Sequence, residues 1–198
     1  MPTLGALLNL GRCPHCNVDT PRLDNIFQCD TNNYTNSDHR FWRIYRCARC
    51  GGVVTAAARN WDQSTIEIYP TPLDVESSIP ERARAYLEQA INSLSSPSGA
   101  VMLAASGVDA MLKAKGYKDG SLYARIDKAA SDHIITEEMA KWAHEVRLDA
   151  NDQRHADEES PLPSVDDARR AVDFAIALGQ FLFVLPARIQ RGIQEAST

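Results

Sequence analysis

The chain has 198 residues, of which 44% are hydrophobic and 24% charged, and its formal net charge is −5 at pH 7; these values suit a soluble protein with one ordinary domain and one small one. Residues 1–60 carry a balance of +3 and residues 61–198 a balance of −8, which argues against a broad nucleic-acid-binding face on the longer C-terminal part. No uninterrupted apolar run approaches about 18 residues and the first ten residues contain no basic segment, so we expect a cytoplasmic protein without a membrane-spanning helix or a secretory signal.

The first 60 residues contain two Cys-x-x-Cys motifs, which are separated by 30 residues. Each motif is typical of a tight turn that directs two sulfurs at one ion, and Gly51 and Gly52 supply backbone freedom after the second. Four of the five cysteines lie in these pairs, which favours a metal in a reducing compartment over disulfides. One structural Zn²⁺, with no coordination position open for catalysis, is therefore predicted on Cys13, Cys16, Cys47 and Cys50.

Short strands are predicted near these motifs, at residues 41–45 and 65–69, so residues 1–72 should form a zinc ribbon with two or three strands. We interpret His15 as a spacer rather than a ligand, and Cys29 as a small buried residue rather than a fifth ligand. Arginines recur every third residue among aromatic residues, as on surfaces that bind nucleic acid. Because alternate residues of a strand face opposite sides, solvated arginines are favoured and nucleic-acid contact is the alternative; the four are Arg40, Arg43, Arg46 and Arg49.

Residues 70–80 contain three prolines and two serines and form the predicted linker, so that the second domain covers residues 73–198. Apolar residues then recur with a helical period. The first helix is expected to begin with a capping box at Ser78–Glu81, and Pro186 is expected to kink or end the last helix. We predict an antiparallel bundle of four to five helices, covering about residues 80–94, 97–116 and 121–130, and beginning again near 136 and 165.

The most informative polar residues of this domain are Arg147, Asn151 and His155, which lie within about 80° of one face if the fourth helix continues that far. Arginine offers a phosphate a fixed charge and forked donors, and histidine can transfer a proton near neutral pH. The alternative is a buried polar network that ties the fourth helix to the last helix or to a partner subunit. The spacing is compatible with both interpretations.

Residues 80–190 resemble the domain of unknown function family 4145, a branch of the HEPN superfamily of helical nucleotide-binding domains. The resemblance implies a helical bundle that dimerises with its polar motif at the dimer cleft, and a preceding zinc ribbon is a familiar arrangement. Many HEPN domains are metal-independent endoribonucleases that leave 2′,3′-cyclic phosphate ends, whereas others are binding or regulatory modules. Five stretches carry the resemblance: 99–103, 108–116, 120–126, 147–155 and 181–187.

Carried over to this chain, the resemblance implies His155 as the acid or base, Asn151 as the residue that orients the phosphate or the imidazole, and Arg147 as the phosphate ligand. Active ribonucleases of the superfamily often have an arginine directly before the Asn-like residue, where this chain has Ala150, and the surrounding residues are acidic. We therefore expect a non-catalytic protein- or nucleotide-binding module, in phage defence or toxin–antitoxin systems. The alternative is a metal-independent endoribonuclease that uses Arg147, Asn151 and His155. The expected partners are a second copy in a homodimer and either RNA or a protein, with no membrane association.

Overall fold

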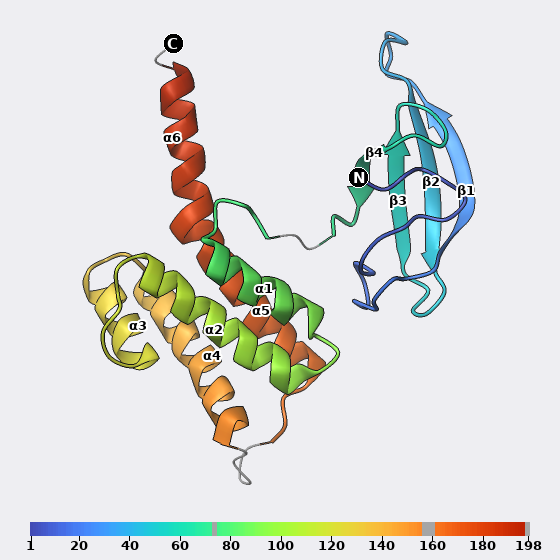
Figure 1. Cartoon of the computed structure of the whole chain (residues 1–198). Coiled ribbons are helices and arrows are strands. Elements are labelled where there is room, and N and C mark those ends of the chain that lie inside the picture. Colours follow the sequence, from blue (N-terminus) through green and yellow to red (C-terminus); the bar gives the residue numbers. More distant parts are fainter. Residues whose placement is uncertain (73–74, 156–160, 197–198) are drawn as a thin grey trace. The chain divides into compact units, whose positions relative to one another are not determined.

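The computed structural model describes residues 1–72, 75–155 and 161–196, and of His155 it describes the backbone alone. The chain divides into two compact units, Met1–Leu73 and Asp74–Thr198. We call these the sheet unit and the helical unit (Figure 1). The predicted combination of a small β-structure with a larger helical part is confirmed.

The sheet unit is built on a four-stranded antiparallel sheet in the order β1-β2-β3-β4 (Figure 1). The strands predicted at 41–45 and 65–69 are confirmed as β2 and β4, whereas the other two were not predicted. Three consecutive alanines in β3 have little intrinsic preference for a strand, but Ala56, Ala57 and Ala58 are fully buried, and burial overrides that preference. The strands are β1 Leu23–Thr31, β2 Arg40–Cys47, β3 Val53–Ala58 and β4 Thr65–Tyr69.

The N-terminal segment completes the core of the sheet unit. Leu4 is fully buried and Leu8 is 1% exposed, and both belong to the cluster that contains the buried ring of Tyr45. The Tyr45 hydroxyl donates a hydrogen bond to the carbonyl of Gly5 at 2.8 Å. Because this segment leads directly into the first Cys-x-x-Cys motif, its burial holds that motif against the sheet.

The helical unit is arranged around α2, which packs against α1, α3, α4 and α5. Small residues of α2 allow this close approach: a Cβ on Gly107 would lie 3.1 Å from Cδ2 of Leu87 on α1. The apolar face predicted for the first helix is buried, with Ala83, Leu87 and Ala90 fully inaccessible. The helices are α1 Glu81–Asn92, α2 Pro97–Ala114, α3 Leu122–Ser131, α4 Glu137–His155, α5 Val165–Gly179 and α6 Leu185–Ala196, with a π-helical turn, η1 Gln180–Val184, between the last two.

The start of α1 differs from the prediction. Pro80 is the N-cap residue and no side chain caps the helix, so the capping box expected at Ser78–Glu81 is wrong. A capping box occurs instead at the start of α5, where the Ser164 hydroxyl accepts from the N–H of Asp167 at 3.2 Å and the Asp167 carboxylate accepts from the N–H of Ser164 at 2.8 Å. The helix starts two residues later than the pattern requires, so Pro80 rather than Ser78 is at the N-cap, and proline has no side-chain acceptor for a capping hydrogen bond.

The last helical run continues through Pro186 from Val165 to Ala196, so the proline does not end the helix; η1 ends at Val184, and Leu185 separates it from Pro186. A π-turn changes the hydrogen-bonding register, which accommodates a residue that has no N–H. By length and composition this run is also apolar enough to cross a membrane, although a core helix of a soluble protein passes the same test. Phe174 and Leu178 of α5 are 1% exposed within the helical core, whereas Leu185 and Ile189 of α6 are 50% and 53% exposed, and 39% of the apolar window is buried.

Candidate metal centre and polar sites of the helical unit

The two Cys-x-x-Cys motifs form the same backbone turn. The N–H of Asn17 donates to the carbonyl of Cys13 at 2.9 Å, and the N–H of Gly51 donates to the carbonyl of Cys47 at 2.9 Å. Asn17 has a φ of 54° and Gly51 a φ of 74°, the left-handed region that asparagine and glycine tolerate best. The two turns therefore have the same backbone conformation, with asparagine at the left-handed position of the first and glycine at that of the second.

These turns bring together the four sulfur atoms of Cys13, Cys16, Cys47 and Cys50, which all lie within 4.8 Å of one another. Metal–sulfur bonds of about 2.3 Å in a tetrahedron separate the sulfurs by about 3.8 Å, and the sulfurs of Cys13 and Cys50 are 3.9 Å apart. The four cysteines are free thiols. The donor set thus fits one metal ion that prefers soft ligands, and four thiolates fill a tetrahedral shell.

Backbone N–H groups help to hold negative charge on these sulfurs. Burial by itself would raise the pKa of the Cys47 thiol, but N–H groups of Cys50 and Arg49 and the thiol of Cys13 outweigh it and lower that pKa to about 7. The N–H of Gly52 also donates to the sulfur of Cys50, at 3.3 Å. The backbone therefore favours the thiolate at Cys47, the form that binds a metal. Burial raises the pKa of the Cys13 thiol, and the pKa of Cys50 is raised as well, because the lowering by the N–H of Gly52 is outweighed by burial and the thiols of Cys16 and Cys47.

His15 joins the two turns without contributing to the sulfur cluster. Its Nε2 lies 2.8 Å from the carbonyl of Val53, beyond the second motif. Gly52 lies against the same ring, and a Cβ on Gly52 would be 2.5 Å from its Cγ. The interpretation of His15 as a spacer agrees with this geometry, and Gly52 is required for space rather than for a positive φ.

The arginines of the sheet unit have different surroundings and do not form one stripe. Arg40 is ion-paired with Asp38 and Glu67. The guanidinium of Arg43 donates to the carbonyl of Leu4 at 2.8 Å and lies 5.1 Å from the ring centre of Trp61. Both side chains bind within the unit, which disfavours a shared nucleic-acid surface. Arg43 is only 12% exposed, so it does not fit the expected solvated arginine. Cys29 is half-buried on β1 and lies outside the sulfur cluster.

In the helical unit, α4 extends to His155, so Arg147, Asn151 and His155 share one continuous helix. Asn151 is exposed, and the side chain of His155 lies outside the described part of the structure. Arg147 is half-buried, with its guanidinium carbon 5.3 Å from the ring centre of Tyr123 on α3, and its Nε is buried without a hydrogen-bond partner among the described residues. Arg147 therefore packs between α3 and α4 rather than standing free.

His144, one turn before Arg147, belongs to the same cluster and was not singled out from the sequence. Its Nε2 lies 2.9 Å from a carboxylate oxygen of Asp127, and its ring centre is 4.8 Å from that of Tyr123. Nδ1 is buried, and no described residue is its hydrogen-bond partner. Tyr123 and Asp127 are four residues apart on α3, and this spacing is the signal by which the sequence could have indicated a shared face.

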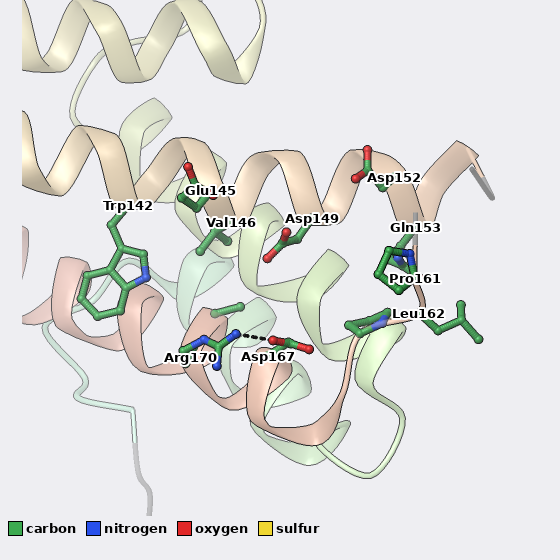
Figure 2. Close-up of a pocket in the computed structure, with 12 residues that line it drawn as sticks. Trp142, Glu145, Val146, Asp149, Asp152, Gln153, Pro161, Leu162, Asp167 and Arg170 are labelled. Atoms are coloured by element: carbon green, nitrogen blue, oxygen red, sulfur yellow. Dashed lines mark hydrogen bonds and ion pairs between the residues drawn. The ribbon is translucent and has the colours of Figure 1, made fainter. Parts of the chain in front are cut away.

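A second polar site is an acidic pocket of about 420 Å³ between α4 and the start of α5 (Figure 2). Asp149 points from α4 toward α5, where Asp167 and Arg170 form an ion pair, and Trp142 closes one end. The pKa of Asp149 is raised, first by burial and then by the charges of Asp167, Glu145 and Asp152. Four carboxylates and one guanidinium around a cavity disfavour phosphate groups; these are Glu145, Asp149, Asp152, Asp167 and Arg170.

Comparison with known proteins identifies the helical unit. The family model described as "Domain of unknown function (DUF4145)" matches residues 87–196, which is more than half of the chain. No curated protein and no solved structure matches the chain. The resemblance to this family, inferred from five sequence stretches, is thereby confirmed, and the chain belongs to the DUF4145 family.

Proposed function

We propose that the chain is a non-catalytic binding and regulatory module, formed by a zinc ribbon and a HEPN-like helical bundle, whose partner is a protein or a nucleotide. The sheet unit supplies four thiolates for one ion, and Zn²⁺ is the ion that commonly occupies a tetrahedral site of four cysteines. Such a site has no position for a substrate, so the metal stabilises the fold of the ribbon.

The observation that carries the proposal is the burial of Ala150. By the resemblance described above, active ribonucleases often have an arginine at this position, and here the alanine side chain is 2% exposed within the core of the helical unit. A guanidinium at that position would be buried without water, which is costly. Arg147, the nearest substitute, contacts Tyr123. This arrangement favours binding over catalysis.

The setting of the module is also a proposal. Free thiols in the sulfur cluster suit a reducing, cytoplasmic compartment. The superfamily resemblance supports a homodimer and a role in phage defence or toxin–antitoxin systems, and the absence of a long uninterrupted apolar run supports a module without membrane association. Size-exclusion chromatography with light scattering would test the dimer, since a monomer at micromolar concentration would remove that part of the proposal.

A metal-independent endoribonuclease is the second candidate, because Arg147, Asn151 and His155 lie on one uninterrupted helix. In that reaction His155 would transfer the proton and Arg147 would stabilise charge on the phosphorane. His144 is a further candidate acid or base, because Asp127 orients its ring at 2.9 Å.

RNA cleavage by the full-length chain in the presence of EDTA distinguishes the two functions. His155→Ala and His144→Ala are compared with His133→Ala as a matched control, and circular dichroism establishes that each variant is folded. The binding module predicts no cleavage by any of these proteins. Cleavage by the wild type that leaves 2′,3′-cyclic phosphate ends and falls by a factor of about 100 or more in one histidine variant would replace the proposal by the ribonuclease.

A further inference from the structure

The helical unit contains a second cavity, of about 670 Å³, on a different set of helix faces from the acidic pocket. It is lined by residues of α1, α2 and α3 and by Arg154 in the last turn of α4. Its lining is basic: four cationic side chains surround it with a single carboxylate. The charged residues are Arg82, Lys113, Arg125, Arg154 and Asp109.

This concentration of positive charge contrasts with the unit that carries it. From Asp74 to Thr198 the sequence has 14 lysines and arginines against 20 aspartates and glutamates. Asp109 is shared by two of the cations, since Lys113 lies 2.5 Å and Arg125 2.6 Å from its carboxylate oxygens. In the described residues neither Arg82 nor Arg154 has an ion-pair partner. The cavity therefore has an uncompensated surplus of positive charge, which attracts anions.

Arg125 is held in place before any ligand arrives. Its guanidinium donates to the Asp109 carboxylate at 2.6 Å and to the carbonyls of Gly120 at 2.6 Å and Lys118 at 3.2 Å. The side chain is 11% exposed, and its Nε is buried without a hydrogen-bond partner among the described residues. A fixed guanidinium at the wall of a cavity binds an anion with little loss of side-chain entropy.

Apart from Ser106 and Ser121, the uncharged lining is apolar or aromatic, and it selects the body of the ligand. Tyr86 is half-buried on the α1 side, and Leu122 is half-buried on the α3 side. Alanines at 83, 105, 110 and 114 complete the wall. A bare inorganic ion would leave this surface in water, whereas a ring would cover it and stack on Tyr86.

We propose that this basic cavity binds a small organic phosphate, with the phosphate between Arg82, Arg154 and Arg125 and an apolar or aromatic body against Tyr86. The inference rests on the proposed binding role of the helical unit and adds its site and its class of ligand. The volume suits a small molecule. The acidic pocket on another face of α4 disfavours a long nucleic-acid strand that extends over both sites.

The test is titration of the ¹⁵N-labelled full-length chain with phenyl phosphate, followed by amide chemical shifts. Inorganic phosphate and benzyl alcohol serve as probes of the charged group and of the ring alone. We expect saturable shifts at Tyr86, Ser106 and Arg125, with phenyl phosphate binding more tightly than either probe. No saturable shift in the millimolar range, or equal binding of benzyl alcohol, would overturn the inference.

Substitution of the exposed arginines assigns the site without threatening the core. Arg82→Gln and Arg154→Gln should each weaken phenyl phosphate binding about tenfold. Arg191→Gln, which removes the same charge from an exposed position of α6, should leave the affinity unchanged. Equal weakening in all three variants would mean a nonspecific charge effect and would refute the site. Such a failure leaves the binding module intact, because the RNA-cleavage result decides that proposal separately.

Discussion

At the scale of single residues, Gly52 and His15 show how little space the sulfur cluster leaves. A Cβ on Gly52 would lie 2.5 Å from ring atoms of His15, and Nε2 of the same ring lies 2.8 Å from the carbonyl oxygen of Val53. Any side chain at position 52 must therefore displace the ring or the backbone that follows Cys50. The two motifs are coupled through this contact as well as through the approach of their four sulfur atoms.

We expect Gly52→Ala to weaken zinc binding about tenfold, because the displaced turn no longer presents the sulfur of Cys50 correctly. Competition with a chromophoric chelator measures the affinity. Gly11→Ala is the matched control, since a Cβ on Gly11 meets no atom within 4 Å and its φ is not positive. Equal affinities of the two variants would show that the contact with His15 does not constrain the turn.

In the acidic pocket, the pKa of Asp149 depends on the residues around it. Its pKa is raised by burial and by the nearby carboxylates of Asp167, Glu145 and Asp152. A carboxyl whose pKa is higher in the folded than in the unfolded state costs stability once pH exceeds the unfolded value. This cost develops as pH rises from about 4 through the raised pKa of the folded state.

Asp149→Asn should therefore raise the free energy of unfolding at pH 7 by about 0.5 kcal/mol, after allowance for solvent screening of a partly exposed group. Urea unfolding monitored by circular dichroism gives the value. At pH 3 the wild-type carboxyl is neutral as well, and the advantage of the variant should disappear. A gain of the same size at both pH values would attribute the effect to something other than charge.

At the scale of elements, the starts of α1 and α5 show that a capping-box pattern in the sequence does not always produce a capping box in the structure. The pattern at Ser78–Glu81 resembles a capping box but has Pro80 at the N-cap. The box at Ser164 and Asp167 is complete, and the hydrogen bonds from Ser164 lower the pKa of the Asp167 carboxyl. Stabilisation by this pair is present above the unfolded pKa of aspartate and is lost as pH falls through the lowered value.

We expect Ser164→Ala to destabilise the helical unit by about 1 kcal/mol at pH 7, because the N–H of Asp167 loses its acceptor. Thermal unfolding followed at 222 nm measures the loss. Ser164→Thr keeps a hydroxyl at the N-cap and should retain most of the stability. If the alanine and threonine variants melt together, the capping hydrogen bond does not stabilise α5 measurably.

At the scale of the whole molecule, the chain is two compact units with separate hydrophobic clusters. The sheet unit has a small core, and the proposed zinc ion compensates for this, because metal binding supplies folding free energy where apolar burial is limited. The helical unit has a larger apolar cluster around α2 and no metal-binding group among its described residues. The two units should therefore respond differently to metal removal.

Chelation with 1,10-phenanthroline should unfold the sheet unit and leave the helical signal at 222 nm largely unchanged. Mass spectrometry of the purified protein should find one zinc per chain. Cys50→Ser should lose that zinc, whereas Cys29→Ser should retain it, because Cys29 lies outside the cluster. A Cys50→Ser protein that retains full zinc and an ordered sheet would contradict the assignment of the four ligands.

Features that depend on the spacing of neighbouring residues could be predicted from the sequence. Paired cysteines at a separation of three residues, strand formers at 41–45 and apolar residues with a helical period each constrain the few residues around them, so the sulfur ligands, β2 and the α1 face could be read directly. Strand β3 could not, because its alanines become strand through pairing and burial. Ser78 shows the limit of a local motif, since one neighbouring proline changes the cap.

The contacts between polar side chains of different helices depend on how the chain packs in three dimensions. His144 and Asp127 belong to different helices, and so do Arg125 and Asp109, and neither spacing nor composition relates them. The same holds for the two cavities, whose opposite charges arise in one acidic domain because packing sorts side chains onto different helix faces. In the sequence, Ala150 is an ordinary helix-forming residue. It becomes buried only when α4 packs into the core, and this burial disfavours an arginine at the position.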